Sequence, residues 1–508
     1  MFNQKNNMNK PLTKYPFQKG TQCHKAIWLN YYRNELKTPP SPEAQMIMDK
    51  GTQVGIIARD LYPGGIDLSK NNTVYGKQLF EETQAALQTD EQIFYEAAFE
   101  TLDGGMNFKA DIFIRCQRAT KLIEVKSSTS IKAPEYILDL AFQYHVLKNS
   151  NYSGPPIEVY IAYLNKEYVR EETLDIDQLF VVENITRRII DAQVLIKNYL
   201  RQFSAVLADA NKCPTVSVSE ACFKPYGCSF FEYCWKDMPK TTVFNISRLR
   251  KAKATQMIEE GIVEPDQIPI DTKLSVEQWI EVNSYRNGKP TINEKEIKIF
   301  LDSLKLDEQT LWMDFETYMS PIPEFIGTRP YQQICFQYSV LVRDASGNIE
   351  RKEFLAERGR DPRKNFIKHL LQDTQGEENI IVYNQAFEIA RMRELAKEFP
   401  EYKHEIEQRI SRIKDLLVPF AKKHYYHPMM NGSASIKVVL PVLVPAEKIS
   451  YKDLSIKNGA IAMNMYERFN QLTLKEQIET RRALLEYCYT DTLGMVKIAE
   501  ALQQIINQ

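Results

Sequence analysis

The sequence contains no long hydrophobic run and no leader-like N-terminus. No apolar stretch among its 508 residues approaches the ~18 consecutive residues that a membrane-spanning helix needs. The first ten residues, MFNQKNNMNK, are polar and lack the apolar core of a secretory signal peptide. These two absences predict a cytoplasmic protein with no membrane partner.

The sequence also lacks an excess of charge of either sign, with 65 Lys and Arg against 66 Asp and Glu. The net charge therefore does not show the excess of basic residues that is typical of nucleic-acid-binding proteins. A nuclease, however, places an acidic metal pocket inside a locally basic groove, and the two cancel in the sum. The overall charge neither favours nor excludes a nucleic-acid enzyme.

Cysteine is scarce, and eight residues in a chain of this length exclude a dense disulfide framework. Three of the eight, Cys222, Cys228 and Cys234, lie close together in CFKPYGCSFFEYC. Clustered cysteines in a cytoplasmic chain are candidate metal ligands. The other five include Cys116, Cys335 and Cys488, whose apolar surroundings are typical of core residues.

The length favours two or three domains. We interpret residues 1–234 as one domain, residues 235–305 as a small helical connector and residues 306–508 as a second domain. The first 110 residues look mainly helical. Three strand-like runs follow, and apolar residues in steps of three and four then predict one long helix from Ile185 to Val206. The strand-like runs cover residues 111–115, 121–126 and 157–164.

Strand-like runs return in the second domain and are followed by helical segments up to the C-terminus. This succession predicts an α/β domain with a mixed sheet. The runs cover residues 311–317, 333–343, 352–356 and 379–384.

The first candidate site combines Asp111 with Glu124 and Lys126. The two strands that carry them are close enough in sequence to form a hairpin, and strand alternation puts Glu124 and Lys126 on one face. Two carboxylates suit Mg²⁺ or Mn²⁺, which activates water and neutralises phosphate charge, while the lysine orients or deprotonates the water. A surface Asp and a Glu–Lys salt bridge are the structural alternative.

Three stretches around this site resemble the RecB-like PD-(D/E)XK nucleases, especially the CRISPR-associated and AddB-like iron–sulfur members. They are, in this order, FKADIFIR, LIEVKSST and DLAFQYHVL. The resemblance implies a restriction-endonuclease-like core in which Gln143 helps to position the site. The sequence departs from the family at two places. A tyrosine is usual where Leu147 stands, and the family often has a histidine on an early helix, a role that His24 is not assigned because it adjoins Cys23.

The same resemblance implies a [4Fe–4S] cluster held by one cysteine before the nuclease core and three after it. Cys23 would then join Cys222, Cys228 and Cys234 as ligands. Zinc is the alternative, since four thiolates hold either group. Cys213 is a spare that could replace one ligand.

The second candidate site begins with WMDFET, where Asp314 and Glu316 share one face of an apolar strand. Buried carboxylates are costly unless they are paired or bound to a metal. Tyr487 and Asp491, in YCYTD, lie one helical turn apart. Between these motifs lies the stretch NIIVYNQAFE, which ends in Glu388. Its pattern predicts a buried strand that is followed directly by a helix.

Together these motifs resemble the DnaQ-like exonucleases of the ribonuclease H-like fold, whose carboxylates hold two metal ions and whose tyrosine orients the water. In that resemblance Asp314, Glu316, Glu388 and Asp491 are the carboxylate positions, and Asp415 resembles an accessory aspartate. The second motif normally ends in aspartate, so Glu388 is a departure that places the activity of this site in question.

Both halves together resemble a bacterial two-module family that is sometimes found near mobile-element or defence genes. We therefore expect a Mg²⁺- or Mn²⁺-dependent nuclease that trims or degrades DNA, acting on single strands or duplex ends. The alternatives are a nucleic-acid-binding adaptor with inactive nuclease folds and an RNA-processing 3′–5′ exonuclease. A cleavage assay on matched DNA and RNA substrates distinguishes the three.

Overall fold

The structure is a computed structural model, and it describes residues 10–69, 77–445, 449–451 and 454–507. The chain divides into two compact units. Unit 1 comprises Met1–Asp237 and a later segment, Ser320–Tyr331. Unit 2 comprises Met238–Met319 and Gln332–Gln508.

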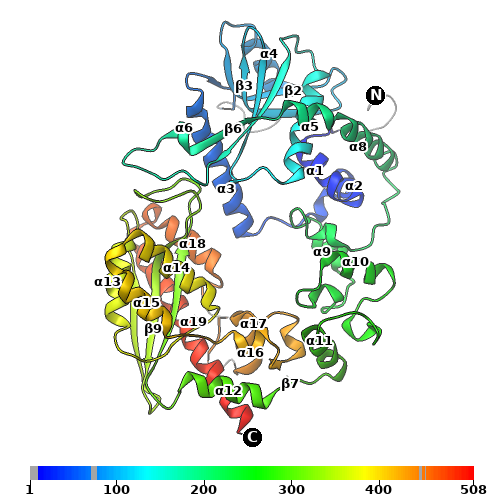
Figure 1. Cartoon of the computed structure of the whole chain (residues 1–508). Coiled ribbons are helices and arrows are strands. Elements are labelled where there is room, and N and C mark those ends of the chain that lie inside the picture. The colour runs from blue at the N-terminus through cyan, green and yellow to red at the C-terminus, as the bar shows by residue number, and fades with distance from the viewer. Residues whose placement is uncertain (1–9, 70–76, 446–448, 452–453, 508) are drawn as a thin grey trace. The chain divides into compact units, whose positions relative to one another are not determined.

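Unit 1 is built on a six-stranded mixed sheet whose strands lie in chain order, β1 to β6 (Figure 1). β2, β3 and β4 are antiparallel, and β5 runs parallel to β4. The three strands expected from the sequence are β3, β4 and β5, and they are confirmed. The strands are β1 Ile66–Asp67, β2 Ile93–Glu100, β3 Asn107–Arg115, β4 Thr120–Lys126, β5 Ile157–Leu164 and β6 Phe180–Asn184.

The expectation that the first 110 residues are mainly helical is wrong for β2 and the start of β3. Both faces of β2 are covered: Phe94 packs in one core cluster and Tyr95 in another. A strand that is buried on both sides shows no alternation of polar and apolar residues. Its sequence therefore lacked the usual strand signal.

Helices pack against the sheet of unit 1. The single long helix expected from Ile185 is two helices, separated at Ala192, although its apolar face is buried as expected at Ile189, Ile196 and Phe203. The helices are α1 Lys14–Gln22, α2 His24–Tyr32, α3 Pro42–Ile57, α4 Lys77–Ala86, α5 Pro134–Lys148, α6 Ile176–Leu179, α7 Thr186–Asp191, α8 Gln193–Val206 and α9 Phe231–Trp235.

Unit 2 contains a five-stranded mixed sheet in the order β10-β9-β8-β11-β12. β8 is antiparallel to β9 and parallel to β11. All four strands expected in this half are present, so the prediction of an α/β protein with mixed sheets is confirmed. The strands are β8 Thr310–Tyr318, β9 Ile334–Arg343, β10 Ile349–Leu355, β11 Ile380–Val382 and β12 Ile413–Asp415.

Helices cover both faces of this sheet (Figure 1). The connector expected at 235–305 is helical and groups with unit 2, where β7 (Thr291–Ile292) pairs with β13 (Tyr425–Tyr426). None of the described helices, including α19 with its 33 residues, is long and apolar enough to cross a bilayer. The longer helices are α10 Lys251–Glu259, α11 Val276–Asn287, α12 Glu294–Leu304, α13 Arg363–Asp373, α14 Gln385–Glu398, α15 Lys403–Ser411, α17 Ile436–Leu443, α18 Gly459–Glu467 and α19 Leu474–Ile506.

The central strand β8 divides its side chains between the two faces. Leu311 and Met313 pack in the core cluster that includes residues of α13, α14 and α15. Trp312 packs in the other cluster, which includes residues of α17 and α19. Because alternate residues of a strand share a face, Asp314 and Glu316 point to the α19 side.

Candidate functional sites

Asp314 and Glu316 of β8 meet Asp491 of α19 in unit 2. One carboxylate oxygen from each lies within 4.8 Å of the other two, and no other set of three His, Cys, Asp or Glu side chains among the described residues comes this close together. An octahedral Mg²⁺ ion with ligands at about 2.1 Å places opposite oxygens about 4.2 Å apart. The 4.8 Å limit on the three oxygens is slightly wider than this, so the three carboxylates could share one such ion after a small closure of the group.

The carboxylates of this group are buried together, which makes their ionised forms unfavourable. Burial and the neighbouring Asp491 raise the pKa of Asp314 to about 8. Burial, with Asp314 and Asp491 beside it, raises the pKa of Glu316 well above its usual range. A bound cation would relieve both effects, so the electrostatics favour a cation at this place.

Tyr487 lies one turn before Asp491 on α19, as the sequence predicted. Burial and the adjacent Asp491 raise the pKa of the Tyr487 hydroxyl far above its usual range. The hydroxyl therefore stays protonated and can donate a hydrogen bond. Cys488 is fully buried, as expected of a core residue, and its Sγ lies 3.7 Å from Asp314 Oδ2.

Glu388 of α14 lies near this group but outside it. Its Oε2 is buried without a hydrogen-bond partner, and burial together with Asp314 raises its pKa well above the usual range. Asp415 is already engaged, since its Oδ1 accepts from the backbone N–H groups of Asn384 at 2.9 Å and Leu417 at 3.0 Å. Glu388 is therefore the spare carboxylate of the site, and Asp415 holds the loop before α14.

Two residues that no motif indicated also contact Asp491. Lys437 of α17 places its Nζ 2.5 Å from Asp491 Oδ1, and the Tyr451 hydroxyl donates a hydrogen bond to the same oxygen. They come from separate segments of the chain. An isolated lysine or tyrosine in such a segment carries no signal that sequence reasoning could use.

The residues of the first predicted site come together in unit 1. Asp111 of β3 accepts a hydrogen bond from the backbone N–H of Val125 in β4, at 2.7 Å. Lys126 Nζ lies 2.6 Å from Glu124 Oε1, and Gln143 Nε2 of α5 donates to Glu124 Oε2 at 2.7 Å. The predicted hairpin and the predicted contact of Gln143 with the site are both observed.

Asp139 and Lys14 complete this centre, and sequence reasoning missed both. Lys126 Nζ lies 2.7 Å from Asp139 Oδ2, and Lys14 Nζ lies 3.2 Å from the same oxygen while also contacting Glu124. Asp139 comes one turn before Gln143 on α5, a spacing that could have been noticed. Lys14 is the first residue of α1, far from the motifs in sequence.

Charge is arranged unevenly in this centre. Burial and the Glu124 carboxylate raise the pKa of Asp111 to about 7. Burial would also raise the pKa of Glu124, but Lys126 and Lys14 together hold it well below its usual range. The two lysines thus neutralise Glu124 and Asp139. Metal binding by Asp111 and Glu124 requires Lys14 to give up part of its contact.

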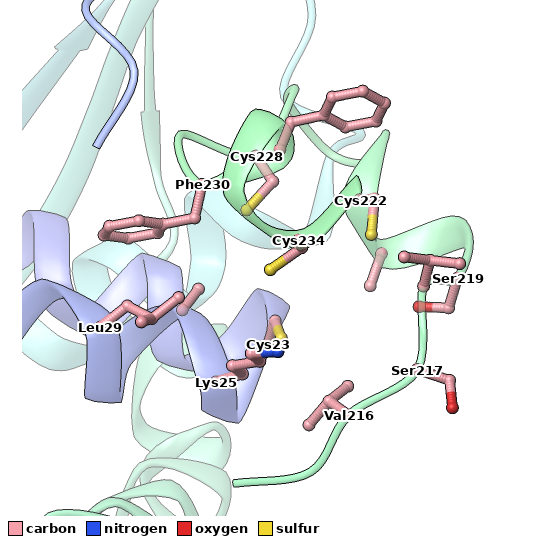
Figure 2. A pocket seen from close by; sticks show the side chains of 14 residues that line it. Cys23, Lys25, Leu29, Val216, Ser217, Ser219, Cys222, Cys228, Phe230 and Cys234 are labelled. Atoms are coloured by element: carbon pink, nitrogen blue, oxygen red, sulfur yellow. The ribbon is translucent and has the colours of Figure 1, made fainter. Parts of the chain in front are cut away.

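The four expected cysteine ligands line one pocket in unit 1, as Figure 2 shows. Cys23 lies between α1 and α2, whereas Cys222, Cys228 and Cys234 belong to the segment that ends in α9. The backbone N–H of Cys228 donates to the carbonyl of Cys222 at 3.0 Å, which closes a turn between them. The spare, Cys213, does not line the pocket.

The cysteine segment is attached to α1 by hydrogen bonds. Gln22 Nε2 donates to the carbonyls of Ala221 and Tyr226, each at 2.7 Å. The Tyr15 hydroxyl lies 2.7 Å from the Ser229 hydroxyl. Since Lys14 is the neighbour of Tyr15, the cysteine segment and the carboxylate centre of unit 1 share one helix.

Comparison with known proteins identifies a related region in unit 2. Residues 311–435 match the family described as Domain of unknown function (DUF2779), a stretch that holds Asp314, Glu316 and Glu388 but ends before Asp491. The chain is similar to Uncharacterized protein UU173 of Ureaplasma parvum, with 26% identity over 267 residues, 48% of this chain and 38% of that protein. It is also similar to Uncharacterized protein MG366 of Mycoplasma genitalium, with 28% identity over 222 residues, 40% of this chain and 33% of that protein. The matches thus span about a third of the length of these curated relatives.

Proposed function

We propose that this chain is a Mg²⁺- or Mn²⁺-dependent nuclease that hydrolyses phosphodiester bonds of DNA. The observation that carries the proposal is the convergence of Asp314, Glu316 and Asp491 within 4.8 Å, with Glu316 and Asp491 buried and Asp314 partly buried. Hard divalent cations prefer oxygen ligands. The buried, unpartnered Oε2 of Glu388 beside the group is a second indication that something further binds there.

The side chains of the unit 2 centre have separable tasks. Asp314, Glu316 and Asp491 would hold the ion, which when bound supplies positive charge to the phosphate and lowers the pKa of the attacking water. Tyr487 keeps its proton and can donate a hydrogen bond that orients the water. In phosphodiester hydrolysis the water oxygen forms a bond to phosphorus and the bond between phosphorus and the sugar oxygen breaks. The water gives up a proton to solvent, and the sugar oxygen takes up a proton and leaves as a hydroxyl group.

The finer fold assignments belong to the same proposal. Unit 1 is a PD-(D/E)XK restriction-endonuclease-like domain, supported by Asp111 on β3, Glu124 and Lys126 on β4, and Gln143 on the following helix. Unit 2 is a ribonuclease H-like, DnaQ-like domain, supported by a mixed sheet with carboxylates on its central strand and on α19. Each unit then carries its own nuclease centre.

A [4Fe–4S] cluster bound by Cys23, Cys222, Cys228 and Cys234 is also proposed. A tetrahedral zinc site with Zn–S bonds of about 2.3 Å holds its sulfurs about 3.8 Å apart. No three of these sulfurs, all within the described part of the chain, lie within 4.8 Å of one another. The four sulfurs are therefore not preset at the spacing of a zinc site, and the choice of a cluster over zinc rests on the resemblance to the iron–sulfur RecB-like nucleases.

The proposed activity is tested with the full chain on labelled DNA and RNA strands of matched sequence, single-stranded and duplex, in Mn²⁺, Mg²⁺ or EDTA. We expect cleavage of DNA with either metal and none in EDTA, because the buried carboxylates alone repel the phosphate. Faster cleavage of RNA than DNA would favour the RNA-processing alternative. Binding of both strands without cleavage would favour the inactive adaptor.

The cofactor proposal predicts that Cys228→Ser removes the cluster. We expect the wild type, purified without oxygen, to contain iron and acid-labile sulfide at about four of each per chain. Cys228→Ser should lose both and melt at a lower temperature, because the two segments of the pocket are no longer joined. Cys213→Ser, adjacent to the pocket but not lining it, is the matched control and should keep its iron. One zinc per chain without iron would reject the cluster and keep the four-thiolate site.

A further inference from the structure

The ammonium of Lys437 is held inside the carboxylate centre of unit 2 by three groups. Besides its ion pair with Asp491, Lys437 Nζ lies 3.9 Å from the centre of the Tyr451 ring and 4.3 Å from that of the Tyr487 ring. A cation is attracted to the negative face of an aromatic ring. Tyr487 is the tyrosine assigned to the attacking water, so the ammonium lies next to the expected place of reaction.

A close approach of two helices brings Lys437 to this position. Gly494 lies one turn beyond Asp491 on α19, and a β-carbon at Gly494 would come within 3.1 Å of Leu440 Cδ2 and 3.7 Å of Ile436 Cδ1, both on α17. The absence of a side chain at Gly494 therefore lets α17 pack against α19. This packing puts the first turn of α17 beside Asp491.

A second lysine of unit 2 shows what a purely structural ion pair looks like here. Lys423 Nζ lies 2.6 Å from Glu281 Oε1, and both side chains are only 3% exposed. Lys437, in contrast, is 27% exposed although its partner Asp491 is 9% exposed. The Lys437 side chain is thus partly open to solvent, whereas that of Lys423 is closed off.

We propose that Lys437 is a catalytic residue that binds the scissile phosphate beside the metal held by Asp314, Glu316 and Asp491. The inference rests on the proposed nuclease function. A lysine ammonium is a compact charge with three N–H donors, which suits a phosphate oxygen. In the absence of substrate the same charge is directed at Asp491, so Lys437 opposes metal binding while it favours phosphate binding.

This double role predicts effects of opposite sign for Lys437→Gln. Mn²⁺ should bind about tenfold more tightly at the site that Asp314→Asn abolishes, because one positive charge near the ion is gone. In the Asp111→Ala background, where only the unit 2 centre is expected to cleave, single-turnover cleavage of a labelled oligonucleotide in saturating Mn²⁺ should fall about 100-fold, as for the loss of one donor to a reacting oxyanion. Lys437→Arg should restore most of the rate. Lys497→Gln removes a lysine of similar exposure, 28%, that pairs with Glu500 on the same helix, and should change neither value.

The outcomes separate this inference from the nuclease proposal. If Lys437→Gln weakens both Mn²⁺ binding and cleavage, Lys437 only anchors Asp491 and the inference is overturned. If it changes neither value while Asp314→Asn abolishes cleavage, Lys437 is a bystander and the proposed function stands. If the wild type cleaves neither DNA nor RNA, the proposed function and the inference fail together.

Discussion

Replacing Asp314 with asparagine is expected to lower release of mononucleotides from DNA ends by about 1,000-fold or more. Asp314 belongs to the one group of three carboxylates that lie within 4.8 Å of one another in the described residues, and an amide cannot supply the lost negative charge. Removal of one preorganised group at a charged reaction centre costs about 100- to 1,000-fold, and loss of the ion itself costs more. The measurement is single-turnover cleavage in about 1 mM Mn²⁺, a concentration on the order of that needed to saturate such sites.

Unfolding should not account for that loss. Burial raises the pKa of Asp314 to about 8, so the ionised carboxylate is unfavourable in the folded state without metal. The folded protein therefore binds more protons than the unfolded chain between about pH 4 and pH 8, and this contribution to stability is lost as the pH rises through that window. Asp314→Asn removes the ionisable group, so at pH 8 in EDTA it should melt no lower than the wild type.

The double variant distinguishes one working centre from two. Asp111→Ala should leave an activity that releases mononucleotides, and adding Asp314→Asn should remove it. Asp302→Asn, an exposed aspartate of α12, is the matched control and should cleave as the wild type does. If Asp111→Ala alone eliminates every product on DNA and RNA, unit 2 is not an active exonuclease and holds substrate instead.

Lys126→Met is expected to abolish cleavage by the centre of unit 1, with a loss of about 1,000-fold measured in the Asp314→Asn background. Lys126 contacts both Glu124 and Asp139, so it orders the carboxylates as well as acting on the attacking water. DNA affinity should change little, because one contact is a small part of a multi-contact groove.

The same substitution should lower the free energy of unfolding by about 3 kcal/mol, because two buried carboxylates lose one of the two lysines that pair with them and keep only the charge of Lys14. Lys126→Arg preserves the charge and serves as the stability-matched comparison: it should fold like the wild type yet cleave poorly, since a planar guanidinium does not replace an ammonium at this place. If Lys126→Met cuts DNA normally, Lys126 is only a salt-bridge partner and the unit 1 proposal loses its main residue.

The sequence could predict those site residues whose spacing follows from strand and helix geometry. Glu124 and Lys126 share a strand face, and Tyr487 and Asp491 share a helix face, so each pair was visible locally. Lys14 was not visible, because it reaches Glu124 only through the packing of α1 on the sheet domain. A contact between residues 110 positions apart is set by tertiary structure, which leaves no local pattern.

The same limit applies to secondary structure. β8 was recognisable because Asp314 and Glu316 interrupt its apolar residues at a strand spacing, whereas the charged residues of β2, Glu96 and Glu100, are four positions apart and give no alternation. The position of Lys437 needed the packing of α17 on α19, which depends on the missing side chain of Gly494, and Tyr451 reaches Asp491 from a later segment of the chain. A single glycine in a helix gives no sign of what it will pack against.

The segment Ser320–Tyr331 folds with unit 1 although the strands before and after it, β8 and β9, belong to unit 2. Its backbone exchanges hydrogen bonds with Arg170, from Arg170 N to Thr328 O at 2.9 Å and from Gly327 N to Arg170 O at 2.8 Å. The Tyr331 hydroxyl donates to the carbonyl of Ser127 at 2.5 Å. The protein therefore cannot be divided into two modules by one break in the chain. A truncated gene that encodes only the second half would expose a stretch whose binding surface had been deleted, and a chimera that borrows unit 1 must also borrow these residues.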